Sequence, residues 1–215
     1  MGINQFDLII FDCDGVLVDS EPIIYRIFAD TLTEFGFIMT YEEVVQQFVG
    51  QSLTICLKII QESYGKPIPA NFVERCREKQ VIALQQELQP VYGISEVLKQ
   101  LTLPKCVASN STHRHIQLVL KLTGLLDIFD GKLYSSHDVP RPKPFPDVYL
   151  YAAEQMNTKP ENCVVIEDSP TGIEAAYAAG MTVFGYSQHS DGAALAAAGA
   201  KIVFNDMRQL FQLLS

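Results

Sequence analysis

The sequence of 215 residues lacks the patterns that place a protein in a membrane, outside the cell or on nucleic acid. No apolar run comes near the roughly 20 residues that a helix needs to cross a bilayer. The first residues, MGINQF, lack the basic and then apolar order of a secretory signal. No cluster of lysine and arginine offsets the formal net charge of -9, which repels nucleic acid and anionic membranes. We therefore expect a cytoplasmic protein without a nucleic-acid or membrane partner.

The sequence also lacks cysteines at the spacings of metal sites or redox motifs. Its five cysteines are scattered, and three of them lie in strand-like apolar runs. They are Cys13, Cys56, Cys76, Cys106 and Cys163. This use of cysteine is typical of reduced, buried thiols in a cytoplasmic protein.

The composition is that of an ordinary globular protein, 48% hydrophobic and 19% charged. A chain of this length can bury one large core, or one core with a smaller inserted domain. The oligomeric state stays open, and a monomer is compatible with the sequence.

Short apolar runs, separated by helix-like stretches, recur along most of the chain. They are Phe6–Phe11, Cys106–Ser109, Lys132–Tyr134, Cys163–Ile166, Thr182–Phe184 and Lys201–Phe204. Strands that alternate with helices form a parallel sheet covered on both faces. We therefore predict an α/β fold with a doubly wound, Rossmann-like parallel sheet.

The alternation disappears between about residues 21 and 88, where the apolar pattern has the period of a helix. Thr40 and Glu43 have the spacing of a capping box, and Gly36 and Gly65 stand at plausible helix ends. We predict an all-helical cap domain at residues 20–89, inserted into an α/β core made of residues 1–19 and 90–215.

Two aspartates, Asp12 and Asp14, follow the first apolar run. Ligands of open parallel sheets bind beyond the carboxyl ends of the strands, and strand alternation sends both side chains to one side. Two neighbouring carboxylates need a cation, and they can serve as nucleophile and as general acid or base. Gly15 lets the chain turn away. The alternative is a solvated turn without chemistry.

Three other strand ends carry polar groups. Ser109 and Asn110 precede a helix, where hydroxyl and backbone N–H groups can hold a phosphate, although they could simply cap the helix. Lys143 stands among alternating prolines that should keep the chain extended. Its ammonium would then be fixed in place, unless the segment is only a rigid connector with a solvated lysine. Glu167 and Asp168 end another strand and offer Mg²⁺ hard oxygen ligands, unless Asp168 only caps the next helix.

Together these groups give several carboxylates, one lysine and two helix N-termini at one sheet edge. A phosphate dianion cannot approach so many carboxylates unless a cation such as Mg²⁺ removes the repulsion. Lys143 can stabilise the charge that develops in an in-line displacement. We therefore expect a phosphoryl-transfer enzyme with Mg²⁺ as cofactor.

Four motifs in this order resemble those of the haloacid dehalogenase (HAD) superfamily. They are DCDGVLVDS at residues 12–20, SNS at residues 109–111, the lysine of RPKPFPD at residue 143, and IEDSPTG at residues 166–172. The helical insertion resembles the cap of the β-phosphoglucomutase-like branch. The stretch from VASN through IEDS is similar to bacterial phosphatases assigned to 6-phosphogluconate.

The resemblance implies a role for each matching residue. Asp12 would attack phosphorus and form an aspartyl-phosphate, and Asp14 would protonate the leaving alcohol and then activate water. Ser109 and Asn110 would bind phosphate oxygens, and Lys143 would bind both the phosphate and Asp12.

The resemblance also implies a metal site. Mg²⁺ would be held by Asp12, by the backbone carbonyl of Asp14 and by Asp168, with Glu167 ligating directly or through water. Asp19 would support the loop rather than react.

Departures from the family's patterns narrow the expected reaction. Dehalogenases lack the second aspartate, so Asp14 disfavours that activity. β-Phosphoglucomutases carry an arginine directly after a G-x-S pattern in the cap, whereas in this chain Gly50–Ser52 is followed by Leu53. They also carry a histidine at the position where this chain has Ile24. Both differences favour water as phosphoryl acceptor.

The sequence thus predicts a phosphoric monoester hydrolase that acts on a small phosphorylated metabolite, a sugar phosphate or a sugar-acid phosphate such as 6-phosphogluconate. A phosphosugar mutase or a catalytically silent phosphometabolite-binding protein is the alternative. A phosphonatase would need a cap lysine, for which Lys58 and Lys79 are available. Histidines on a polar helix face are more often solvated than catalytic, so we expect His113 and His115 to be solvated and assign them no role.

Overall fold

The computed structural model describes residues 6–49, 51 and 53–214. The chain forms two compact units, Met1–Asp19 with Gln89–Ser215, and Ser20–Leu88. Gly50 and Ser52, which carry the G-x-S comparison, lie outside the described residues. That residues 20–89 act as a cap domain stays a prediction.

The first unit is built on a six-stranded sheet in the order β3-β2-β1-β4-β5-β6. All paired strands in it run parallel. The strands are β1 (Leu8–Phe11), β2 (Lys105–Ser109), β3 (Leu133–Ser135), β4 (Cys163–Glu167), β5 (Thr182–Tyr186) and β6 (Ile202–Phe204). The sheet order changes direction at β1, so the predicted doubly wound α/β fold is confirmed.

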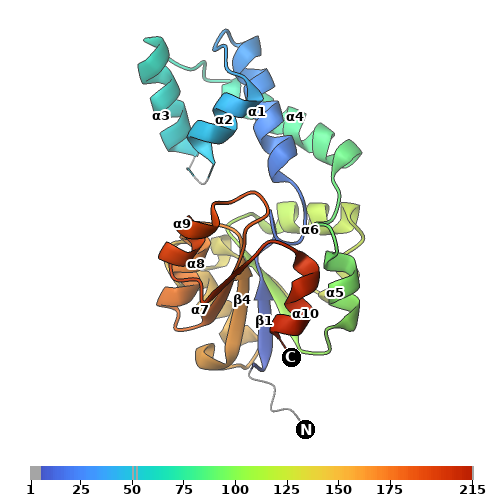
Figure 1. Ribbon diagram of the computed structural model, residues 1–215. Helices are drawn as coiled ribbons and strands as arrows, with labels where there is room; N and C mark the ends of the chain where they lie inside the picture. Colours follow the sequence, from blue (N-terminus) through green and yellow to red (C-terminus); the bar gives the residue numbers. More distant parts are fainter. Residues whose placement is uncertain (1–5, 50, 52, 215) are drawn as a thin grey trace. The chain divides into compact units, whose positions relative to one another are not determined.

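Helices cover the sheet, as Figure 1 shows. They are α5 (Ile94–Gln100), α6 (His113–Leu122), α7 (Asp147–Gln155), α8 (Pro170–Ala178), α9 (Gly192–Ala197) and α10 (Leu210–Leu213). Short 3-10 turns lie at Leu126–Ile128, Ser136–Asp138, Pro160–Asn162 and Met207–Gln209. Val148 of α7 and Ile173 of α8 are fully buried in one apolar cluster with Leu8 and Ile10 of β1. This packing fixes the central strand against its helical layer.

The register of the central strands brings the carboxyl ends of β1, β2 and β4 to the same edge of the sheet. Phe11, the last residue of β1, pairs with Val107 of β2 and with Ile166 of β4. The next residue, Asp12, still donates its N–H to the Ile166 carbonyl at 3.0 Å. The residues that follow β1, β2 and β4 therefore meet at the same edge of the sheet.

The second unit consists of α1 (Glu21–Glu34), α2 (Tyr41–Phe48), α3 (Leu53–Tyr64) and α4 (Phe72–Glu87). Phe28 packs edge-to-face on Phe48 and Phe72, with ring centroids 6.2 and 5.8 Å apart. The predicted capping box is confirmed, because Thr40 and Glu43 exchange side-chain and backbone hydrogen bonds at the start of α2. No helix among the described residues is long and apolar enough to cross a membrane.

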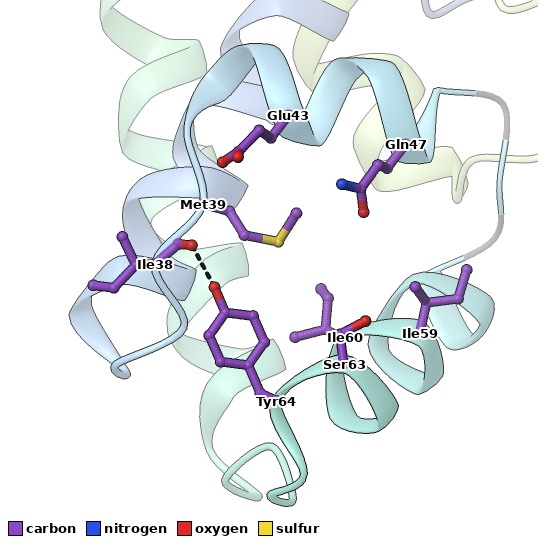
Figure 2. A pocket seen from close by; sticks show the side chains of 8 residues that line it. All are labelled: Ile38, Met39, Glu43, Gln47, Ile59, Ile60, Ser63 and Tyr64. Carbon is purple, nitrogen blue, oxygen red and sulfur yellow. Dashed lines mark hydrogen bonds between the residues drawn. The ribbon is translucent and has the colours of Figure 1, made fainter.

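A small pocket of about 150 Å³ lies within the helical unit. Figure 2 shows its lining, which comes from α2, α3 and the segment before α2. Two of its polar groups are already used inside the unit. Glu43 caps α2, and the Tyr64 hydroxyl donates to the Ile38 carbonyl. Glu43 and Tyr64 therefore already have partners within the helical unit.

Candidate active site

Lys143 joins the ends of three strands. Its ammonium donates to Asp12 Oδ1 at 2.6 Å, to Glu167 Oε1 at 2.8 Å and to the Ala108 carbonyl at 3.0 Å. Asp12 and Lys143 are only 8% and 6% exposed. An ammonium has three donors, so this lysine is fully bonded and held in one orientation. The structure thus brings the predicted Asp12, Lys143 and Glu167 together.

The turn that presents Lys143 differs from the extended segment we expected. The Phe145 N–H donates to the Pro142 carbonyl at 3.0 Å, and the Lys143–Pro144 peptide bond is cis. Asn110 holds this turn from the side, because its Oδ1 accepts the Lys143 N–H at 3.0 Å. Nearby Arg141 forms a surface ion pair with Asp147 at 2.7 Å. Local hydrogen bonds, rather than proline stiffness alone, therefore position the lysine.

The charges in this cluster do not balance. Burial raises the pKa of Asp12 to about 7, against the opposing charge of Lys143. Burial also disfavours the charged forms of Lys143 and Glu167. Their attraction to neighbouring charges nevertheless holds the lysine pKa well above its ordinary value and the Glu167 pKa below its own. One ammonium faces two buried carboxylates, so a further cation would stabilise ionised Asp12.

Glu167 is the most heavily bonded acid of the site. Its Oε1 accepts from Lys143 and from the Tyr149 hydroxyl at 2.9 Å. Its Oε2 accepts from the N–H groups of Asp168 and Ser169 and from the Ser169 hydroxyl, at 2.9 to 3.0 Å. Both oxygens are thus occupied by donors within the protein. In this arrangement Glu167 orients Lys143, and a bond to a metal would require it to release some of these donors.

Two glycines make room for the acids. Gly15 has a φ of 81°, and a Cβ atom there would lie 1.9 Å from Asp168 Oδ2. A Cβ atom at Gly172, in the first turn of α8, would lie 1.6 Å from Glu167 Oε1. Glycine is therefore required at both positions, and the Asp168 carboxylate lies directly against the turn that follows Asp12 and Asp14.

The donor set fits Mg²⁺ with few protein ligands. Among the residues that the structure describes, no group of three or more His, Cys, Asp or Glu side chains forms a metal cluster. Mg²⁺ commonly takes one or two carboxylates and keeps several waters. Asp12 and Asp168 are both buried and supply such oxygens, which the Asp14 backbone carbonyl could complete. The ligation of Mg²⁺ by Glu167, directly or through water, stays a prediction.

The serine motif lies beside the cluster. Ser109 is buried, and its hydroxyl accepts the Ser111 N–H at 3.1 Å. Thr112 is the residue that caps α6, by accepting the His115 N–H at 3.3 Å. Ser109 therefore stands at the sheet edge while a different residue provides the helix cap.

His115 is a residue that the sequence interpretation missed. Its Nε2 lies 3.0 Å from Asp14 Oδ1, and the Ser111 hydroxyl donates to Asp14 Oδ2 at 2.9 Å. Burial lowers the pKa of His115, but the bond to Asp14 and its charge outweigh that effect and raise it. The expectation of a solvated side chain was wrong for His115. It fits His113 better, because that side chain is 44% exposed and pairs with Asp138 at 2.8 Å.

The position of His115 in α6 was the available signal. It stands in the first turn of a helix that begins directly after β2. Such a turn lies over the sheet edge where the acids gather. Asp19 bonds His189 at 2.9 Å and its N–H donates to the Gln89 carbonyl, and its supporting role stays a prediction.

The doubly wound sheet carries a buried aspartate, lysine and glutamate at its carboxyl edge, which agrees with the hydrolase family that comparison with known proteins identifies. Residues 9–186 match the family described as haloacid dehalogenase-like hydrolase. The chain belongs to this family, and it is a phosphoric monoester hydrolase. The family inferred from the four motifs is thereby confirmed.

Individual relatives are similar along most of their length. The chain is 34% identical to the 6-phosphogluconate phosphatase of Escherichia coli, over 85% of this chain and 83% of that one. It is 32% identical to the phosphorylated carbohydrates phosphatase of Thermotoga maritima, over 90% and 92%. A crystal structure of a HAD family hydrolase from Deinococcus radiodurans, with bound phosphate and sodium, superposes with a TM-score of 0.86. It is 33% identical and covers 98% of this chain and 96% of that one.

Proposed function

We propose that this enzyme hydrolyses a small sugar phosphate or sugar-acid phosphate through a phosphorylated Asp12, with Mg²⁺ as cofactor. The observation that carries the proposal is the buried contact of 2.6 Å between Asp12 and Lys143 at the end of the central strand. It supports a carboxylate held in place for attack beside a cation that can face a phosphate.

In the proposed reaction, a carboxylate oxygen of Asp12 forms a bond to phosphorus while the bond to the leaving oxygen breaks. Asp14 gives its proton to that oxygen, then takes a proton from the water that releases phosphate from Asp12. Lys143 holds Asp12 in place and faces the charge of the phosphoryl group. Bound Mg²⁺ would offset the charge of the phosphate and the carboxylates.

Ser109 and Asn110 have different proposed tasks. Ser109 is buried at the sheet edge, and we assign its hydroxyl the task of donating to a phosphoryl oxygen. Asn110 contacts the backbone of Lys143 on both sides, at 3.0 Å and 3.4 Å. We therefore assign it to holding the lysine turn, with phosphate contact as a second role.

The substrate class rests on the relatives. The two phosphatases described above are named for 6-phosphogluconate and for phosphorylated carbohydrates. We therefore propose a phosphorylated sugar or sugar acid as substrate, with 6-phosphogluconate as the first compound to try.

The test is a phosphate-release screen over phosphorylated sugars and sugar acids, with Asp12→Asn as the inactive variant. We expect release that depends on Mg²⁺, stops in excess chelator and falls below detection in Asp12→Asn, because the amide is a poor nucleophile. Asp130→Asn is the control, since that side chain is 88% exposed and in a positive-φ conformation that asparagine tolerates. Full activity of Asp12→Asn would contradict the mechanism.

A further inference from the structure

We propose that Ser111 and His115 form a clamp that positions the Asp14 carboxyl group, which gives its proton to the leaving group. This inference rests on the proposed function, since it concerns the acid of that reaction. Both residues act through Asp14, so they are positioning residues.

The clamp bonds both oxygens of one carboxylate. Ser111 Oγ donates to Oδ2 at 2.9 Å, and His115 Nε2 lies 3.0 Å from Oδ1. A carboxylate held by one bond can still rotate, whereas one bond to each oxygen fixes the plane of the group. The Asp14 and His115 side chains are only 23% and 27% exposed, so water competes weakly for these bonds.

The clamp is itself held by its neighbours. Ser135 donates its hydroxyl to the Ser111 carbonyl at 2.7 Å, and Ser109 accepts the Ser111 N–H. Thr112 accepts the His115 N–H and so fixes the first turn of α6. Ser111 and His115 are therefore in place before any ligand arrives, as a preorganised support requires.

Asp14 needs such support because of where it lies. It stands in a turn that reverses at Gly15, whose N–H donates to the Val18 carbonyl at 2.9 Å. Asp12, by contrast, has the ammonium of Lys143 to hold it. Without Ser111 and His115, the Asp14 side chain would lose a hydrogen bond to each of its two oxygens.

The clamp predicts an effect that depends on the leaving group. A sugar alkoxide is a strong base and must be protonated as it departs, whereas 4-nitrophenolate leaves without help. A misplaced Asp14 should therefore slow attack on a sugar phosphate and spare 4-nitrophenyl phosphate. kcat/KM is the proper measure, because it reports the steps up to departure of the leaving group and not the later hydrolysis of phosphorylated Asp12.

The experiment compares Ser111→Ala, His115→Ala and His115→Gln with the unaltered enzyme. The substrates are 4-nitrophenyl phosphate and the alkyl phosphate that the screen identifies. We expect each alanine variant to lose about tenfold or more in kcat/KM on the alkyl phosphate and less than about threefold on 4-nitrophenyl phosphate. His115→Gln should recover much of the loss, because a glutamine amide can place a donor near the position of Nε2.

His113→Ala is the matched control, since it removes a histidine of the same helix turn that pairs with Asp138 instead. It should leave both substrates unchanged. Equal losses on both substrates, or no loss on either, would overturn the clamp, whereas an unaltered enzyme that releases no phosphate would overturn the proposed function. If one alanine variant does not fold, the other and His115→Gln still distinguish a clamp from its absence.

Discussion

Lys143 donates its three ammonium protons to Asp12, Ala108 and Glu167, which come from three parts of the chain. All three of these residues are buried. Removing this cation would leave the carboxylates of Asp12 and Glu167 buried together. Breaking a buried ion pair by deleting one partner costs about 3 to 5 kcal/mol. The lysine is therefore expected to support folding as well as catalysis.

We predict that Lys143→Ala lowers the free energy of unfolding by about 3 kcal/mol and abolishes phosphate release. Urea unfolding in chelator measures the first effect and the phosphate assay the second. Tyr149→Phe is the matched control, because it deletes one uncharged donor to Glu167 and should cost about 1.5 kcal/mol. An equal cost for the two variants would contradict the importance of the buried charge.

Replacing Gly172 by alanine would have two opposed effects on stability. Alanine is favoured over glycine in a helix by about 1 kcal/mol, yet a Cβ atom here would enter the space of a carboxylate held by five donors. We predict that Gly172→Ala is destabilising and slows phosphate release. Gly192→Ala in α9 serves as control, because its Cβ atom would make a tight contact of 3.3 Å with Val203 rather than overlap a carboxylate. A higher melting temperature for Gly172→Ala would contradict the prediction.

Single residues also show where sequence reasoning stops. Asp12 and Lys143 were recognised from local motifs, because strand ends and prolines mark their positions. The partners of Asn110 and Asp14 were not, since they lie 33 and 101 residues away along the chain. A histidine on a helix looks the same in the sequence whether it faces water or an aspartate.

At the scale of elements, the six strands could be predicted because buried parallel strands are short, continuous apolar runs. Their bounds moved by one or two residues, as for β5, which extends to Tyr186. Their order in the sheet was not predicted, because the apolar runs carry no signal for which strands pair. The capping box of α2 could be predicted from the sequence, because its two hydrogen bonds join residues three positions apart.

We predict that Thr40→Ala lowers the free energy of unfolding by about 1 kcal/mol, because Thr40 accepts the Glu43 N–H at the start of α2. Thr54→Ala, at an exposed position within α3, should cost nothing or stabilise slightly. Thermal unfolding followed by circular dichroism compares them. Equal melting temperatures would show that the cap contributes no stability.

At the scale of the whole molecule, the expectation of reduced, buried thiols is confirmed, because all five cysteines are free and buried. Burial raises the pKa of each thiol, in Cys163 to about 12. A raised pKa leaves less thiolate at a given pH, and the thiolate is the reactive form.

We predict that a thiol reagent such as Ellman's reagent reacts slowly with the folded protein at pH 8. After unfolding in guanidinium it should react quickly with all five thiols. The absorbance of the released thiolate counts them in both states. Rapid reaction of two or more thiols in the folded state would contradict the burial described for them.

The order of the strands has a consequence for synthesis on the ribosome. β1 is made first, yet its partners β2 and β4 begin only at Lys105 and Cys163. A nascent chain that ends before Cys163 therefore carries an apolar strand with an open edge, the kind of edge that pairs with other chains. The same missing strand would leave Lys143 without Glu167. Both edges of the central strand are closed, and its lysine fully bonded, only when three quarters of the chain has emerged.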